Sequence, residues 1–211
     1  DLRTRDRMLV TKDATIREIH HRVKNNLQTV AALLRMQSRR LESEEGREAL
    51  RDAMRRVSSI SVVHDMLSQS LDEDVAFDGV CDRILLMVGD LAATSGSVRA
   101  VRVGSFGQVR ADAATSLAMM ITELCQNAIE HGLQGGEGCI EVRPETFEEG
   151  MTVDVVDNGV GLPDGFKLGN QTSLGLAIIS TLVSDLDGAL EIGDRTDGQG
   201  TCARLALPSL V

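Results

Sequence analysis

The sequence predicts an α+β protein in two parts. We expect a hairpin of two long helices over residues 1–72, followed by a sandwich of helices on one face of a mixed sheet over residues 73–211. Three observations carry this prediction. Residues 3–40 contain no Gly or Pro, apolar residues recur at helical spacing up to Leu67, and after the polar segment SLDEDVAFDG helical and alternating patterns mix.

Two apolar stripes predict the helices of the hairpin. They comprise Ile16, Ile19, Val23, Leu27, Val30 and Leu34, and then Leu50, Met54, Val57, Ile60, Val63 or His64, and Leu67. Between them lies LESEEGRE, where we expect the turn at Gly46 and a helix start near Glu44 and Glu45. A lone hairpin cannot bury both stripes, so we expect a homodimer in which two hairpins form a four-helix bundle.

Two adjacent histidines, His20 and His21, lie in the first helix within EIHHRVKNNLQ. At ~100° per residue, His20 lies ~60° from the mean direction of the first stripe and His21 ~160° from it. We therefore expect His20 at the edge of the apolar seam and His21 facing solvent. A residue that reacts with a group on another domain has to be exposed, so His21 is the candidate.

The second part alternates helices and strands. We expect helices over residues 80–93, 112–132 and 173–187. The predicted strands lie in VRAVRVGSFG, CIEVRPE, MTVDVVDNG, GALEIGD and TCARLALP.

Composition excludes several classes of protein. The chain has no apolar run of about 18 residues that could cross a membrane. Four Phe and no Trp or Tyr leave few stacking platforms, which argues against direct nucleic-acid binding. The four scattered cysteines predict reduced core thiols in the cytosol and no zinc site. The chain opens with Asp, and we expect a cytoplasmic piece of a longer protein.

The charge is divided between the two parts. Residues 1–60 hold 14 Lys and Arg against 9 Asp and Glu, and the remainder holds 8 against 23. The basic part could dock an acidic surface or simply be a solvated helix face.

The stretch ELCQNAIEHG places polar groups on one face of the third predicted helix. Glu123, Asn127, Glu130 and His131 follow at i, i+4, i+7 and i+8. Carboxylate and amide oxygens suit a hard cation, and an imidazole can contact phosphate. A solvated helix face would show the same pattern.

The stretch DNGVGLP ends a predicted strand. Asp157 can accept a hydrogen bond from an exocyclic amine there, and Gly159 and Gly161 allow close backbone approach. An Asp-Gly turn alone is usually only a turn, but a helix start at SLGLAII follows. There Gly175 leaves N–H groups free for phosphate.

Two further segments extend this picture. DGFKLGNQT is polar and glycine-containing, and we expect a mobile flap over a nucleotide, with Lys167 as its only cation. GQGTCARLALP offers Thr201 on the last strand. The pattern GxxxxGK[ST] does not occur, which excludes a P-loop.

Taken in order, these motifs resemble the Bergerat-fold (GHKL) ATPase domain shared by gyrase, Hsp90-type chaperones, MutL and histidine kinases. Together with EIHHRVKNNLQTVAALLRMQSRR, they are similar to sensor histidine kinases whose dimerisation helices are of the HisKA_2 type, close to the HWE group. The resemblance covers residues 10–208. It implies a two-component kinase core that autophosphorylates a histidine with Mg·ATP and transfers the phosphoryl group to an aspartate of a response-regulator receiver domain.

The resemblance also implies roles for single residues. Asn127 resembles the asparagine that binds Mg²⁺, with Glu123 as a nearby carboxylate that binds through water or acts as a base. Asp157 resembles the aspartate that reads adenine. The remaining matches are glycines of the phosphate side and lid, and a threonine near the adenine pocket: Gly159, Gly161, Gly175 and Thr201.

One position departs from the family pattern. Many relatives carry Lys three residues after the metal-binding asparagine, where this chain has Glu130. Contact with phosphate would then come from His131, Lys167 or backbone N–H groups.

The family pattern places the phosphorylated histidine directly before Arg-Val-Lys-Asn, which is His21 here. The reaction needs a neutral imidazole, whose ordinary pKa is ~6.5. We expect Arg22 and Lys24 to favour the neutral form and Glu18 to oppose them. Glu18 is the local candidate base and Glu123 is its rival.

Two alternatives to an autokinase stay open. One is a dimeric nucleotide-binding module that signals by docking without catalysis, which Glu130 in place of Lys favours. The other is an anti-sigma-type serine kinase of the same ATPase fold, although such proteins lack a long helical hairpin.

Overall fold

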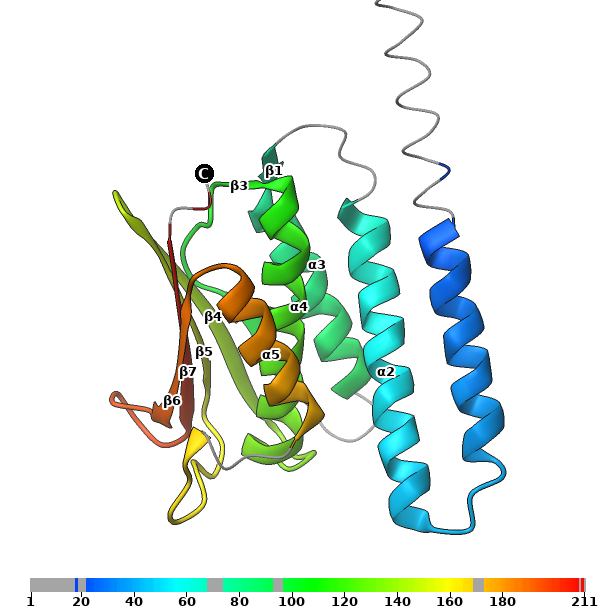
Figure 1. Ribbon diagram of the computed structural model, residues 1–211. Helices are drawn as coiled ribbons and strands as arrows, with labels where there is room; N and C mark the ends of the chain where they lie inside the picture. Colours follow the sequence, from blue (N-terminus) through cyan, green and yellow to red (C-terminus); the bar gives the residue numbers. More distant parts are fainter. Residues whose placement is uncertain are drawn as a thin grey trace, which may run out of the picture. The chain divides into compact units, whose positions relative to one another are not determined.

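The computed structural model describes residue 18 and residues 22–67, 74–92, 97–168, 173–208 and 210. The chain divides into two compact units, Asp1–Asp72 and Glu73–Val211. Figure 1 shows the helices of the first unit and the helix-and-sheet layers of the second. The α+β class predicted from the sequence is confirmed.

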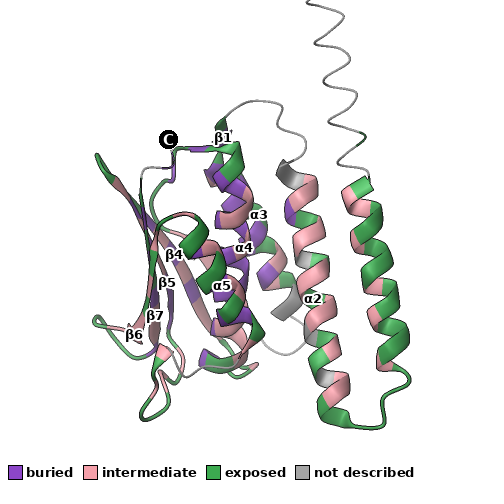
Figure 2. Cartoon of the chain, viewed as in Figure 1, coloured by how far each residue is buried: buried purple, intermediate pink, exposed green. Residues whose placement is uncertain are grey.

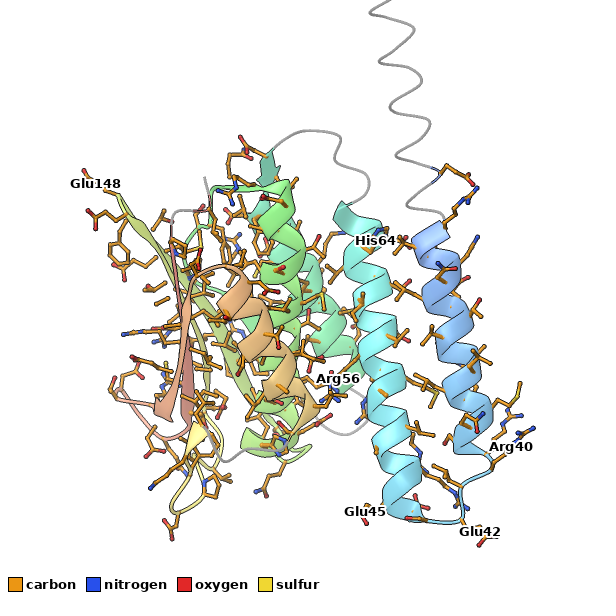
Figure 3. All side chains as sticks on the ribbon, in the orientation of Figure 1. Arg40, Glu42, Glu45, Arg56, His64 and Glu148 are labelled. Carbon is orange, nitrogen blue, oxygen red and sulfur yellow. The ribbon has the colours of Figure 1, made fainter. Side chains whose placement is uncertain are left out.

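The first unit is a helical hairpin. Residues 22–38 form a helix, and α2 spans Glu44–Leu67. The turn lies at residues 39–43, so its prediction at Gly46 is wrong. Gly46 belongs to the first turn of α2 because its N–H bonds to the side-chain oxygen of Ser43 at 3.3 Å, as at a helix N-cap. The side chains of Arg40, Glu42 and Glu45 point outward around the turn (Figure 3).

The two helices run antiparallel and leave apolar side chains exposed. Lys24 near the start of the first helix pairs with Asp65 near the end of α2. Most described side chains of this unit are half-buried or exposed (Figure 2). Val30, Leu33 and Met36 are 43%, 52% and 51% exposed. Their spacing of three places them along one side of the helix.

The second unit is built on a five-stranded mixed sheet of order β2-β4-β5-β7-β6. Its strands are β2 (Val98–Arg102), β4 (Gly138–Phe147), β5 (Gly150–Asp157), β6 (Ala189–Asp194) and β7 (Thr201–Pro208). The β2–β4 pair is parallel, and the other pairs are antiparallel.

Three helices cover one face of this sheet (Figure 1). They are α3 (Phe77–Ala92), α4 (Ala111–Asn127) and α5 (Leu174–Asp185), with α4 in contact with both others. Alternate strand residues such as Val153 and Leu205 are fully buried beneath them, as are Leu117 and Ile121 of α4. This alternation is the period of a half-buried strand.

The opposite face of the sheet carries charge. Cross-strand pairing aligns Arg143, Asp154, Arg204 and Glu191 in one row across four strands. Signs alternate along the row, and Arg204 donates two hydrogen bonds to Asp154 at 2.7 and 2.6 Å. This pairing raises the pKa of the Arg204 guanidinium. Opposite charges at paired positions stabilise a sheet modestly.

The sequence did not predict a second, two-stranded sheet. It pairs β1 (Asp74–Ala76) with β3 (Gln108–Arg110). Each strand has three residues, too few to show a period. A tertiary contact accompanies the pair, because the rings of Phe77 and Phe106 meet edge to face at 4.9 Å between centroids.

Two helix ends differ from the prediction. The helix expected over residues 112–132 is α-helical only to Asn127, and Ala128–Gly132 form a π-helix, η1. The N–H of Leu133 donates to the carbonyl of Ala128 at 2.8 Å. Residue 173 is the N-cap of α5, because the Ser173 side-chain oxygen accepts the N–H of Leu176.

We expect the native thiols to differ in reactivity. Burial raises the pKa of the Cys81 thiol to about 12 and raises that of Cys125 as well. Because the thiolate is the reactive form, both should resist iodoacetamide at pH 8 while half-buried Cys139 reacts. Peptide mass spectrometry measures this, with the urea-unfolded chain as the control in which all four cysteines react. Native labelling of Cys125 at the rate of Cys139 would contradict the expectation.

Candidate active site

A cavity of about 700 Å³ lies within the second unit. Its wall includes the end of α4 with η1, the carboxyl end of β5, part of β6 and β7, and the start of α5. Polar residues of the wall come from different elements and are Asn127, Glu130, His131, Gln134, Asp157, Ser173 and Thr201. Residues far apart in sequence therefore meet at one site.

Asp157 is the most constrained polar group of the cavity. It is 3% exposed at the end of β5. Its Oδ1 accepts the backbone N–H of Gly159 at 2.8 Å and that of Thr201 at 3.2 Å. No other hydrogen bond to this carboxylate is found among the described residues. Oδ2 is thus available to accept a hydrogen bond from a donor in the cavity.

Three glycines allow backbone segments to pack closely around Asp157. A Cβ on Gly132 would lie 2.8 Å from the carboxylate of Asp157, and one on Gly159 would lie 2.1 Å from the carbonyl oxygen of Gly132. At Gly200, φ is +125° and a Cβ would lie 2.0 Å from the carbonyl oxygen of Asp157. Only glycine fits at these three positions.

Two of these three glycines were not predicted from the sequence. Gly132 and Gly200 stand in EHG and GQG, which show no pattern of their own without the fold. Gly161, at φ +83°, lines the cavity, whereas Gly159 lies just outside its wall. A nucleotide contact by either glycine stays a prediction, and packing alone explains Gly159.

Asn127, at the end of α4, lines the cavity, whereas Glu123 of the same helix does not. Asn127 is half-buried and lines the cavity. Glu123, one turn earlier, is 7% exposed and lies outside the wall. In the next turn, the Gln126 side-chain amide donates to Glu130 Oε1 at 2.9 Å. Glu130 and His131 both line the cavity from η1.

The predicted flap is partly described. Pro163 and Phe166 line the cavity, whereas Lys167 is exposed and not part of its wall. Residues 169–172 lie outside the described residues. Gly175 is buried in the first turn of α5 behind Ser173, which does line the cavity. The phosphate roles of Lys167 and Gly175 stay predictions.

In the helical hairpin, His20 and His21 lie outside the described residues. Glu18 is described, and its carboxylate accepts the Nε–H of Arg22 at 2.8 Å. Lys24 pairs with Asp65. Both cations expected to act on the His21 imidazole therefore pair with carboxylates, and their effect on its protonation stays a prediction.

Known families and proteins are similar to both units of the chain. A family described as "Histidine kinase" matches residues 18–91, and one described as "Histidine kinase-, DNA gyrase B-, and HSP90-like ATPase" matches residues 112–210. The chain is 53% identical to the sensor histidine kinase PdtaS of Mycobacterium tuberculosis over 211 residues. The chain belongs to the histidine kinase family. The resemblance found in the sequence is confirmed.

Two further relatives of this histidine kinase chain extend the comparison. PdtaS of Mycolicibacterium smegmatis is 52% identical, and in both PdtaS comparisons 99% of this chain spans 42% of the relative's length. The histidine kinase domain of the Erythrobacter litoralis EL346 blue-light-activated kinase has a TM-score of 0.60 at 21% identity, covering 93% of this chain and 91% of that domain. The latter likeness shows a shared fold. No helix in the described ranges is long and apolar enough to cross a membrane.

We expect Gly159→Ala to destabilise the second unit by about 1–3 kcal/mol, because the added methyl meets the Gly132 carbonyl and overpacks a closed corner. Gly193→Ala is the matched control, since a Cβ there meets nothing within 4 Å. Urea unfolding followed by circular dichroism suits a chain without Trp. Equal midpoints for both variants would refute the packing role.

Proposed function

We propose that this chain is the catalytic core of a two-component sensor histidine kinase, which phosphorylates its own His21 with Mg·ATP and passes the phosphoryl group to a response regulator. The observation that carries the proposal is Asp157, a buried carboxylate held by two backbone N–H groups at the wall of a cavity of about 700 Å³. Family membership adds the hairpin on which the histidine stands.

Asp157 suits adenine recognition. With Oδ1 held by Gly159 and Thr201, its carboxylate has a fixed direction and can accept the exocyclic amine of adenine through Oδ2. A buried acceptor that is left unpaired is costly, so a base without such an amine binds less well. The apolar wall residues Leu124, Val155 and Ile192 suit the faces of a purine.

Asn127 and the start of α5 suit the phosphates. The Asn127 side-chain oxygen is a ligand type that Mg²⁺ accepts, and Mg²⁺ typically completes its shell with phosphate oxygens and water. Mg²⁺ held there would neutralise charge that develops on the transferred phosphoryl group. Ser173 and Leu176 line the cavity at the start of α5, where the first backbone N–H groups of a helix favour an anion; the N–H of Leu176 itself is taken by the Ser173 cap.

The proposed reaction has two phosphoryl transfers. A neutral imidazole nitrogen of His21 attacks the γ-phosphorus, the N–P bond forms, and the bond to the β,γ-bridging oxygen breaks so that ADP leaves with the electron pair. The proton of the imidazole passes to a base, for which Glu18 and Glu123 both remain candidates. A receiver aspartate then attacks the phosphorus and releases the histidine.

A dimer completes the proposal. The exposed apolar residues Val30, Leu33 and Met36 would be covered by a second hairpin in a four-helix bundle. We further propose that the core works in the cytoplasm, where ATP and receiver domains occur and where its free cysteines stay reduced.

A nucleotide-binding module without catalysis is the second candidate, favoured by Glu130 at the cavity wall. It predicts nucleotide binding without phosphorylation of the chain or a partner. A serine kinase would instead give a label that acid does not remove.

Asp157→Asn should weaken ATP binding at least about tenfold, the factor of a single 1.4 kcal/mol contact, because the amide replaces part of the acceptor by a donor. Asn127→Asp should weaken it as well. Isothermal titration calorimetry measures both, with Asp185→Asn, at an exposed position near the end of α5 and outside the cavity wall, as the control. Unchanged affinity in both site variants would disprove the site.

Incubation with γ-labelled ATP should give an acid-labile, base-stable label on the chain. We expect His21→Gln to abolish the label and His20→Gln to retain it, because only His21 is predicted to face solvent. Phosphopeptide mapping under basic conditions checks the position. A labelled His21→Gln together with an unlabelled His20→Gln would reverse the assignment. Glu18→Gln and Glu123→Gln, compared in the same assay, identify the base.

The purified chain should be a dimer at micromolar concentration in light scattering. Leu33→Glu should shift it toward monomer, because a carboxylate would be buried in the apolar interface. Gln28→Glu, at an exposed polar position of the same helix, should leave the dimer intact. A monomeric parent chain would rule out the bundle.

A further inference from the structure

Gln134 has a backbone conformation that its side chain makes unfavourable. Its φ is +52°, in the left-handed region, where the Cβ of any residue other than glycine crowds the backbone. Among the residues that the structure describes, one other non-glycine residue has a positive φ, and it is Asp187. Aspartate is a residue type enriched in this region, whereas glutamine is not. A glutamine at this position therefore needs a reason outside the backbone.

The left-handed turn itself serves to end the helix. Leu133 is the C-cap of η1, and Gln134 is the residue after it. The N–H of Gly135 donates to the carbonyl of Ile129 at 3.1 Å, and that of Gly136 donates to the carbonyl of Leu133 at 2.8 Å. Bonds of this kind close a helix end in which glycine usually occupies the left-handed position. Glycine would make the same turn without strain, so the turn does not explain the side chain.

Gln134 belongs to the wall of the cavity. The residue is exposed, and its side chain makes no hydrogen bond to another residue within the described ranges. Its amide offers two N–H donors and a carbonyl acceptor. Strained residues of this kind cluster at ligand sites, where the strain is kept because the side chain is needed. Asp187, at the same φ, lies outside the wall.

The position of Gln134 is at the end of the cavity where the base is proposed to bind. Gly132, two residues earlier, approaches Asp157 so closely that a Cβ on it would lie 2.8 Å from the carboxylate. Asn127, the proposed ligand of the metal, lies about two helical turns before Gln134. The Gln134 amide is therefore near the exocyclic amine that Asp157 would bind, and away from the phosphates.

We propose that the side-chain amide of Gln134 donates a hydrogen bond to a ring nitrogen that flanks the exocyclic amine of adenine, and so is a specificity residue of the site. This inference rests on the proposed binding of adenine by Asp157 and adds a second contact to the base. The edge of adenine presents an amine donor beside a ring-nitrogen acceptor. Asp157 as acceptor and Gln134 as donor together match that edge.

The test measures binding of ADP, which carries no phosphoryl group for transfer to the histidine, and of its 1-deaza and 7-deaza forms. Each form replaces one ring nitrogen that flanks the amine by C–H. Calorimetry on the full chain in excess Mg²⁺ gives the affinities. The parent chain should bind one of the two analogues at least about threefold more weakly than ADP, the factor of a modest neutral hydrogen bond. Gln134→Gly should bind ADP as weakly as the parent binds that analogue, and should lose nothing further with the analogue.

The same variant separates binding from folding. Glycine accepts the left-handed φ, so the urea midpoint of Gln134→Gly should equal or exceed that of the parent while its affinity for ADP falls. Gln134→Glu has the same shape but replaces the N–H donor by an acceptor, and it should bind ADP no better than Gln134→Gly. Asp187→Gly is the matched control, since Asp187 has the same φ and is exposed outside the cavity wall. It should leave the affinities for ADP and both analogues unchanged.

Equal affinities of the parent chain for ADP and both analogues overturn the inference without any variant. An equal loss with the analogue in the parent and in Gln134→Gly also overturns it, as does ADP binding by Gln134→Gly at the affinity of the parent. Absence of ADP binding by the parent chain would instead reject the proposed nucleotide site itself.

Discussion

The two hydrogen bonds to Asp157 Oδ1 are the constraint on which the cavity depends. They join the loop after β5 to the start of β7, and they fix the direction of a buried carboxylate. The backbone approaches so closely around it that Gly132, Gly159 and Gly200 admit no side chain. The end of the helix, the loop and the last strand therefore meet in one rigid corner, and the cavity opens beside it.

The other side of the cavity is built by a change of helix type. α4 ends at Asn127, and the chain continues as the π-helix η1, which places Glu130 and His131 on the cavity wall. π-helices are rare in proteins, and those that occur frequently lie at functional sites. Here η1 brings an amide oxygen and a carboxylate, within four residues of each other, to the same wall of the cavity.

The polar residues of the candidate site could be predicted from sequence motifs, whereas the glycines that close packing requires could not. Asn127, Asp157 and Thr201 could be named because each donor or acceptor stands at the end of a patterned helix or strand. Gly132 and Gly200 could not, because their requirement arises from neighbours distant in sequence. The three-residue strands of the small sheet lack a period, and the turn of the hairpin was misplaced because the Ser43 cap outweighs the usual reluctance of glycine to enter a helix.

The charged row on the helix-free face has a consequence for the site on the other side of the sheet. Arg204 opposes Asp154, and three residues further along the same antiparallel pair Thr201 reaches Asp157. Sliding β7 by two residues would place Arg204 opposite Thr152 or Val156, without its carboxylate, and would move the Thr201 N–H away from Asp157. The ion pair thus favours the register of β7 on β5 in which the Thr201 N–H meets Asp157. A contact on one face of the sheet therefore supports a hydrogen bond to a buried carboxylate on the other face.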